Sequence, residues 1–494
     1  MAFSSLRAFV DFLEERRQLI RVRESVDPRL EIAEIADRMM KSPGGGKALL
    51  FENVKGARFP VLINALGSRE RMAWALGVER FEALADEIAQ LAKTTPPASW
   101  TQKIRMLPKL AKFASYMPKA IKSGACQECT IDPPDLTEIP ILTCWPMDAG
   151  PFITFAYVVT KDPTSGVRNV GIYRMQVYDK QTTGMHWQIH KVGARHYQYY
   201  KERGERMPVA ACIGGDPILT WCGCAPLPDG LDEFMVAGLL RKKAVELVPC
   251  KTVPLEVPAE CDFVIEGYVD PNVPLRVEGP FGDHTGYYSL AEPYPAFHVT
   301  AITHRRDPVY FTTIVGKPPM EDGWMGKAVE RLSLPLLKMT FPEIADINLP
   351  VEACFHNLAI IAIKKQYPGH AHKIMHSLWG TGQLMFSKTI VVVDHDVDVQ
   401  NVGEVVWRVS NNIDPRRDVV FTEGPVDALD HSAPRPLIGS KMGIDGTRKW
   451  REEGHPREWP PDIVMDGETK KRVNALWERI FSNSSRKLPQ PTTN

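Results

Sequence analysis

The feature that most constrains the fold is a change of pattern along the chain. Between about residues 150 and 315, short runs rich in Val, Ile, Phe and Tyr are separated by Gly, Pro, Asp and Asn. Such punctuated runs are typical of a β-barrel or a sandwich-like domain. Strands are expected over 155–159, 170–177, 263–268, 297–302 and 309–314, with further strands over 210–212 and 218–222 and an embedded helix over 231–242.

Helix and strand signals alternate on both sides of this middle region. The periodicity predicts helices over 6–13 and after Asp27-Pro28, then a strand over 48–51. Further along, strands are predicted over 358–363 and 389–393, and helices around 374–378, over 402–409 and, as an amphipathic element, over 473–481. Because 494 residues exceed what one hydrophobic core supports, we predict a mixed α/β chain of three domains. Their expected bounds are 1–115, 116–322 and 323–494.

Composition excludes several classes of protein. Sixty Lys and Arg balance sixty Asp and Glu, which argues against a nucleic-acid partner. No run approaches the roughly 18 apolar residues of a membrane span, and the first ten residues do not have the pattern of a secretory signal. Nine scattered cysteines do not form a disulfide framework, so a cytoplasmic location is expected. The close pairs Cys126/Cys129 and Cys222/Cys224 are interpreted as core or loop thiols rather than as half of a zinc site.

Residues 103–125 are basic, with no acidic residue among them. One interpretation is a patch for a membrane surface or an anionic partner, which would place the protein at the periphery of the inner membrane. The other is a solvated linker, which two interrupting prolines favour.

Three segments outside this stretch carry polar residues suited to chemistry. In Arg168–Arg174, a regular strand would turn Asn169 and Arg174 to opposite faces, so a bulge or a strand end is needed if both serve one site. In Glu278-Gly-Pro-Phe-Gly-Asp283, a rigid turn holds two acids close together, and an arginine between them would keep one ionised. His190 and Glu233, with Asn169, are donors of the kind that Mn²⁺ or Mg²⁺ accepts.

Other motifs are weaker or missing. His372 and His376 share a helical face, but the glutamate of a metalloprotease motif is not present. The sequence also has no P-loop, no nucleophile-elbow motif and no dinucleotide-binding glycine motif after a strand.

Five segments in chain order resemble the UbiD decarboxylases, and most closely the branch that acts on 3-polyprenyl-4-hydroxybenzoate. They are 49–56, 169–174, 278–288, 363–367 and 439–443. The resemblance implies an N-terminal α/β domain, a central split β-barrel of flavin-reductase type and a C-terminal α/β domain used in oligomerisation. It implies a carboxy-lyase that uses prenylated FMN, supplied by a partner flavin prenyltransferase, with Mn²⁺ (or Mg²⁺) and K⁺.

The resemblance also implies roles for individual residues. The metal ligands would be Asn169, His190 and Glu233. The catalytic network would be Arg174, Glu278 and Asp283, with Asp283 as the acid that protonates the carbon. Further cofactor-binding residues would be Ile172, Tyr173, Arg174, His186, Trp187, Gln188, Lys191, Val192 and Lys388. Two positions depart from the family, since His186 stands where close members carry Arg and Val192 where they carry Gly.

The expected reaction is the reversible, non-oxidative decarboxylation of an aromatic or α,β-unsaturated acid. A (polyprenyl) 4-hydroxybenzoate-type acid of ubiquinone biosynthesis is the favoured substrate, because Asp283 stands where some aryl-acrylate decarboxylases have Glu. Loss of CO2 leaves a carbanion, and only a cofactor supplies the electron sink that it needs. The alternatives are another small aromatic acid, a split-barrel flavin oxidoreductase, and a non-catalytic scaffold. A homo-oligomer, either dimer or hexamer, is expected.

Overall fold

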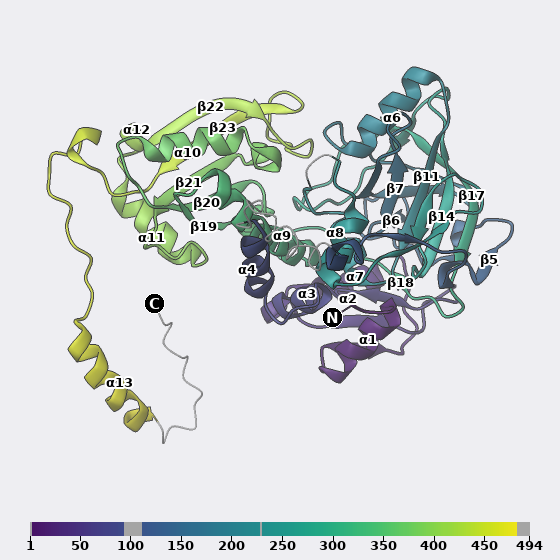
Figure 1. Ribbon diagram of the computed structural model, residues 1–494, viewed down its shortest axis with the longest axis horizontal. Helices are drawn as coiled ribbons and strands as arrows, with labels where there is room; N and C mark the ends of the chain where they lie inside the picture. Colours follow the sequence, from purple (N-terminus) through teal and green to yellow (C-terminus); the bar gives the residue numbers. More distant parts are fainter. Residues whose placement is uncertain (1, 93–110, 228–229, 482–494) are drawn as a thin grey trace. The chain divides into compact units, whose positions relative to one another are not determined.

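The computed structural model describes residues 2–92, 111–227 and 230–481 (Figure 1). The chain divides into two compact units, Met1–Thr447 and Arg448–Asn494. The expectation of a mixed α/β fold is confirmed. Part of the basic stretch, residues 103–110, lies outside the described residues.

The first unit begins with a four-stranded sheet in the order β1-β2-β3-β18. The expected opening helices and the strand over 48–51 are present. The run 309–314, expected in the barrel, instead supplies β18, whose Tyr310 pairs in parallel with Val61 of β3. The apolar pattern of a strand does not determine which sheet it joins. The elements are α1 (Leu6–Glu15), β1 (Leu19–Val22), α2 (Glu31–Met40), β2 (Ala48–Phe51), β3 (Val61–Ile63), α3 (Arg69–Ala75), α4 (Phe81–Ala92) and β18 (Tyr310–Phe311).

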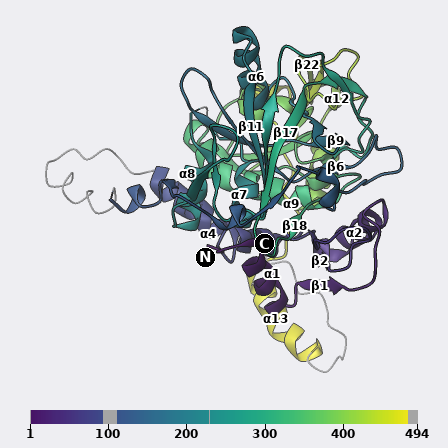
Figure 2. The same ribbon diagram turned by 90° about the vertical axis from the view of Figure 1, so that its right-hand side faces the viewer.

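The middle of the chain forms a nine-stranded sheet in the order β6-β9-β10-β17-β14-β11-β7-β8, with β5 paired to β17. Its strands are antiparallel, and α6 lies beyond one end of β11 and β17 (Figure 2). The elements are β5 (Cys129–Ile131), β6 (Phe152–Ile153), β7 (Tyr157–Lys161), β8 (Arg168–Ile172), β9 (Met175–Asp179), β10 (Thr182–Gly184), α6 (Val192–Arg203), β11 (Met207–Ile213), β14 (Phe263–Val269) and β17 (Ala296–His304).

The order of the strands shows why this sheet curls. β8 is the last strand on one side, β9 is the second strand from the other side, and only Tyr173 and Arg174 separate them in the chain. Three residue steps span at most about 10 Å. The two sides of the sheet must therefore meet at Tyr173–Arg174, which makes a curled half-barrel. The expected single strand over 170–177 is wrong, because the chain breaks there to join the two sides.

Smaller elements cover the curled sheet. The expected strand over 218–222 is wrong, since these residues form α7. Pro217 opens that helix, and the Asp216 carboxylate caps it by accepting from the Ile218 N–H at 3.3 Å. The embedded helix α8 is confirmed. The elements are β4 (Lys119–Ala120), α7 (Pro217–Cys222), α8 (Glu233–Arg241), β12 (Glu246–Pro249), β13 (Glu256–Pro258), β15 (Arg276–Glu278) and β16 (Glu292–Tyr294).

After the long helix α9 the chain forms a five-stranded sheet in the order β19-β20-β21-β23-β22, in which β20 and β21 are the two strands that the sequence predicts. Alternate residues of β20 and β21 are buried on opposite faces, one face against Ile374 of α10 and the other against Val405 of α11. The elements are α9 (Glu321–Thr340), β19 (Ile344–Asn348), β20 (Leu358–Ile363), α10 (His370–Trp379), β21 (Thr389–Asp394), α11 (Val402–Asn412), α12 (Pro415–Asp418), β22 (Val419–Pro425) and β23 (Ile438–Asp445).

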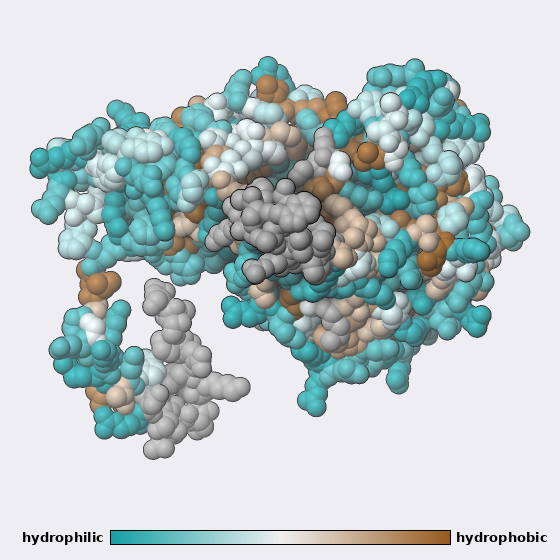
Figure 3. Space-filling view, in the orientation of Figure 1, coloured by the Kyte–Doolittle hydropathy of each residue, from teal (hydrophilic) through white to brown (hydrophobic). Residues whose placement is uncertain are grey.

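The second unit holds the expected amphipathic helix, α13 (Gly467–Phe481). Its apolar residues Val473, Leu476, Trp477 and Ile480 are exposed. The face drawn in Figure 3 is mostly hydrophilic, with hydrophobic residues in small separate areas. Across the described ranges, no helix combines the length and the apolar character needed to cross a bilayer.

Candidate functional site

Arg174 lies at the break between β8 and β9, where the two sides of the curled sheet meet. Its guanidinium donates two hydrogen bonds to Glu278, from Nε to Oε1 at 2.8 Å and from Nη2 to Oε2 at 2.9 Å. Nη1 donates to Oδ2 of Asp283, and Nη2 also donates to the Ser289 hydroxyl at 3.1 Å. The Glu278–Asp283 turn and the strand break therefore deliver two acids to one arginine, as the sequence predicts.

His186 completes the cluster, which we call the Arg174 network (Arg174, Glu278, Asp283 and His186). Its Nδ1 lies 3.1 Å from Oε2 of Glu278, and its ring lies 4.2 Å from the Tyr294 ring. All four members of the network are buried, and Glu278 has no exposed area at all. A bidentate, buried pair of this kind has directional and strong hydrogen bonds.

The surroundings keep both acids of the network ionised. Burial alone would raise the pKa of Asp283, but the hydrogen bond from His284 and the charge of Arg174 outweigh it and hold that pKa well below its usual value. For Glu278 burial again raises the pKa, and the hydrogen bonds from His186 and Arg174 bring it below its usual value. Because its carboxylate is ionised, Asp283 must first receive a proton from a neighbouring group before it can act as an acid.

A second group of polar residues lies at the other end of β8. The Val170 N–H donates to Oε2 of Glu233 at 3.0 Å, and Asn169 donates to the Tyr173 hydroxyl at 3.4 Å. Glu233 stands at the first position of α8, after the Asp232 cap. Burial raises the pKa of Glu233 to about 7, against the backbone hydrogen bonds that it accepts and the charge of Arg168.

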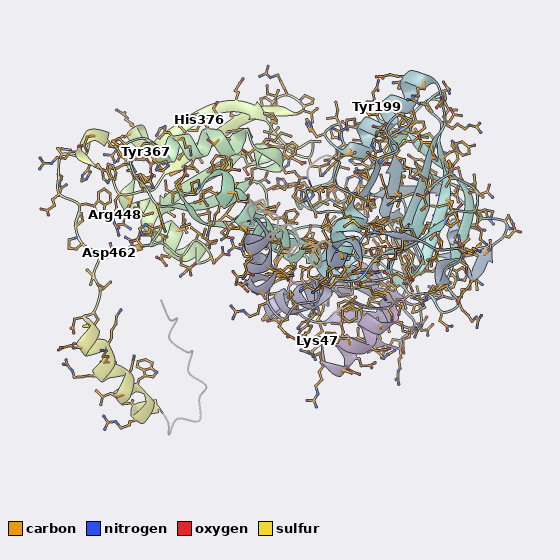
Figure 4. The ribbon with its side chains drawn as sticks, viewed as in Figure 1. Lys47, Tyr199, Tyr367, His376, Arg448 and Asp462 are labelled. Carbon is orange, nitrogen blue, oxygen red and sulfur yellow. The ribbon has the colours of Figure 1, made fainter. Side chains whose placement is uncertain are left out.

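A cavity of about 290 Å³ opens beside these residues. Asn169 and Glu233 line it together with Arg168, Val192 and Tyr199, the last on α6 (Figure 4). Carboxylate and amide oxygens are ligands that Mg²⁺ and Mn²⁺ accept. Two of the three expected metal ligands thus share one cavity.

The structure places other expected residues elsewhere. His190 is exposed, and its ring lies 5.3 Å from the Phe386 ring. Within the described part of the chain, no contact joins it to Asn169 or Glu233. The Lys388 ammonium lies 2.7 Å from the Asp430 carboxylate, so it already has an anionic partner.

His186 and Trp187 each have a buried ring nitrogen that is free to contact a ligand. Nε2 of His186 and Nε1 of Trp187 are buried, and no hydrogen-bond partner lies near either within the described residues. A Cβ at Gly193 would lie 2.8 Å from the Trp187 nitrogen, so only a bare backbone fits against that ring. Tyr173 accepts from the Gly193 N–H at 3.2 Å. The two buried, unpaired ring nitrogens support a polar ligand here.

The remaining expected flavin contacts lie on the same two segments. Ile172 ends β8 and donates its N–H to the Gly223 carbonyl at 3.0 Å. The Gln188 carbonyl accepts from the Lys191 N–H at 2.9 Å, and Val192 opens α6. The first bond joins β8 to the end of α7, and the second closes a turn within the run from 186 to 192.

Sequence reasoning missed several participants. His284 lies inside the segment 278–288 that the sequence analysis singled out, and Ser289 follows that segment directly. The motif could therefore have suggested both residues. The Nε2 atom of His356 lies 2.8 Å from the Nε2 atom of His284, and no local pattern in the sequence marks His356. A contact between residues 72 positions apart is a product of the fold.

The chain matches three family models that together cover most of its length. They describe the N-terminal domain (residues 10–91), the Rift-related domain (119–318) and the C-terminal domain (323–446) of 3-octaprenyl-4-hydroxybenzoate carboxy-lyase. The matching family is one of carboxy-lyases, so the chain is an enzyme of that class. The chain is a member of the UbiD family, as its motifs indicate.

Relatives span the whole chain. An uncharacterized protein of Archaeoglobus fulgidus is 52% identical over 97% of this chain and 99% of its own length. One of Aquifex aeolicus is 50% identical over 97% and 99%. Among solved structures, the UbiD-class enzyme HmfF from Pelotomaculum thermopropionicum in complex with FMN has a TM-score of 0.79 at 32% identity, covering 95% of this chain and 99% of its own. The closed form of Sedimentibacter hydroxybenzoicus vanillic acid decarboxylase has a TM-score of 0.84 at 29% identity, covering 97% and 100%.

Proposed function

We propose that this chain catalyses the reversible, non-oxidative decarboxylation of an aromatic acid, with prenylated FMN and a divalent metal as cofactors. The observation that carries the proposal is the buried arginine held between two carboxylates. Structural neighbours support it, since one form of HmfF is described in complex with prenylated FMN. Within the class, a (polyprenyl) 4-hydroxybenzoate-type acid of quinone biosynthesis is the proposed substrate.

Arg174 is suited to orient the carboxylate that leaves as CO2. A guanidinium has five N–H groups, and four of them have partners among the described residues, on Glu278, Asp283 and Ser289. The fifth, on Nη1, lies beside Asp283. A substrate carboxylate that accepts from this N–H would lie next to Asp283, which would bring the reacting carbon near the acid.

Asn169 and Glu233 would hold the metal, with His190 as the third ligand if its segment turns toward the cavity. The unpaired ring nitrogens of His186 and Trp187 would bind the flavin, together with Ile172, Tyr173 and the run 188–192. The bound flavin supplies the electron sink that no side chain provides. A Mn²⁺ ion, with K⁺ nearby, would balance the flavin phosphate.

We further propose a cytoplasmic homo-oligomer of three domains, 1–115, 116–322 and 323–494, that receives its cofactor from a flavin prenyltransferase. All nine cysteines are free thiols, which fits a reducing compartment. The exposed apolar residues of α13 suit contact with a second copy of the chain.

The test begins with protein co-expressed with a flavin prenyltransferase. A modified-flavin absorbance spectrum, stoichiometric metal and CO2 release from members of a panel of aromatic and unsaturated acids would establish the function. The matched variant Arg174→Lys keeps the charge but loses the bidentate geometry, and should lower kcat strongly. Flavin-loaded protein that oxidises NAD(P)H and releases no CO2 would instead identify an oxidoreductase and refute the proposal.

A further inference from the structure

The ionised state of Asp283 leaves open where its proton comes from. Its two oxygens have different partners: Arg174 holds Oδ2, while Oδ1 accepts from the His284 backbone N–H at 2.7 Å and lies 2.8 Å from Nδ1 of the His284 ring. Only Oδ1 therefore faces a group that can exchange a proton, because arginine does not deprotonate in proteins.

His284 in turn contacts a second histidine from a distant part of the chain. Its Nε2 lies 2.8 Å from Nε2 of His356, which precedes β20. Two imidazole nitrogens at this distance must share one hydrogen, since one donates and the other accepts. The other nitrogen of His356, Nδ1, is buried and has no hydrogen-bond partner within the described residues. The pair thus ends on a buried nitrogen that has no partner among the described residues.

The backbone around His356 is built to present its ring. Cys354 and Phe355 adopt φ values of 54° and 47°, which only a well-supported turn maintains in residues other than glycine. The Phe355 ring stacks on His284 at 5.6 Å, and it fits against α9 because position 326 is glycine, where a Cβ would lie 2.9 Å from the ring. This packing fixes both imidazoles.

We propose that His284 and His356 form a proton-delivery pair that supplies Asp283 through Nδ1 of His284. The inference rests on the proposed function. Both histidines act through Asp283, so they are positioning residues rather than groups that touch the substrate.

The transfer balances in atoms and charge. The Nδ1–H bond of His284 breaks and an O–H bond forms on Oδ1 of Asp283, so an imidazolium and a carboxylate become neutral together. Asp283 then gives this proton to the carbon that has lost CO2. The pair regains a proton from water, which makes one proton consumed per CO2 released.

The electrostatics of the surroundings agree with this assignment. Burial lowers the pKa of His284, but Asp283, Asp322 of α9 and Asp427 outweigh it and raise that pKa above its usual value. Burial, followed by the charges of His284 and Lys191, lowers the pKa of His356 to about 4, against the opposing charges of Asp427 and Asp430. His284 therefore carries the shared positive charge, and His356 accepts from it as a neutral ring.

Two isosteric variants separate proton delivery from geometry. His284→Asn keeps a donor near the Nδ1 position, and His356→Gln keeps one near Nε2, but neither can exchange a proton at neutral pH. His376→Gln on the exposed side of α10 is the matched control (Figure 4). We expect each of the first two to lower kcat by about 100-fold, with KM, metal and flavin content unchanged, and the control to match the wild type.

The pH profile provides the decisive readout. The donor must be protonated, so wild-type kcat should fall as pH rises through the pKa of His284, and this basic limb should vanish in both variants. Histidine NMR of flavin-free protein gives a second readout, in which His356→Gln shifts the titration of His284. Variants with the kcat and basic limb of the wild type, or a His284 titration that His356→Gln leaves unmoved, would overturn the pair. Flavin-loaded wild type that turns over no acid would instead refute the proposed function.

Discussion

Replacing Arg174 by Met should destabilise the protein in a manner that depends on pH. The change leaves Glu278 and Asp283 buried without their cation. Breaking a buried ion pair by removing one partner typically costs about 3–5 kcal/mol. Each kcal/mol shifts the melting temperature of a domain of 150–250 residues by roughly 2–4 °C, and by less in a larger unit. Arg174 lies in the unit Met1–Thr447, so a loss of several degrees is expected at pH 7.

The sign of the pH dependence follows from the two carboxylates. In the wild type their pKa values lie below the usual range, so their contribution to stability is present above the unfolded pKa and is lost as pH falls through the folded pKa. Without Arg174, burial raises both folded pKa values and protonation relieves the variant on acidification. The gap between the two proteins should therefore be smaller at pH 5 than at pH 7.

Differential scanning fluorimetry of flavin-free protein at the two pH values measures both effects. The matched control is Arg206→Met, whose exposed guanidinium lies 2.9 Å from Asp270 and contributes far less to stability because solvent screens the pair. Adding Glu278→Gln to Arg174→Met should cost less than the sum of the single changes, because the two groups are in contact. If Arg174→Met lost no more than the control, or lost equally at both pH values, the buried-charge reasoning would be wrong.

Three further outcomes are expected. Asp283→Asn should leave flavin and metal content unchanged and lower CO2 release by about 100-fold or more; full activity would exclude Asp283 as the acid. Glu233→Ala should lower the metal content, measured by elemental analysis, and weaken flavin retention. Glu79→Ala serves as the control, because that exposed carboxylate pairs with Arg16 and does not line the cavity. Deleting residues 467–494 should lower the oligomer mass in light scattering, and an unchanged mass would exclude α13 from the interface.

Much of the fold could be predicted from local patterns because it depends on local causes. The helix over 6–13 follows from apolar residues at helical spacing with Ser5 as a cap, and the strand over 48–51 from a fully apolar run. The segment 218–222 was predicted wrongly for a local reason, since Asp216-Pro217 is a helix start that outweighs the apolar run behind it. The run 309–314 was assigned to the wrong sheet for a long-range reason, because its pairing with β3 depends on residues some 250 positions away.

In the candidate site too, some contacts have local causes that the sequence shows, and others depend on the packing of distant segments. Glu278 and Asp283 could be predicted to lie together because one short turn joins them, and the structure places Arg174 between them. His356 could not be predicted, because only the packing of α9 against the turn at 354–355 brings it to His284. The His186 substitution gains a structural account, since its Nδ1 bonds Glu278 while Nε2 stays free for a ligand.

The break at Tyr173–Arg174 explains how one strand serves two purposes. Asn169 lies in the regular part of β8, where pairing with Thr160 of β7 fixes it at the cavity that Glu233 also lines. Had the strand continued regularly, Arg174 would lie on the face opposite Asn169, and the sheet would have to remain open. The break instead closes the curl and turns Arg174 onto the two acids. The constraint that shapes the half-barrel is thus the same one that assembles the site, so an insertion between β8 and β9 should damage both together.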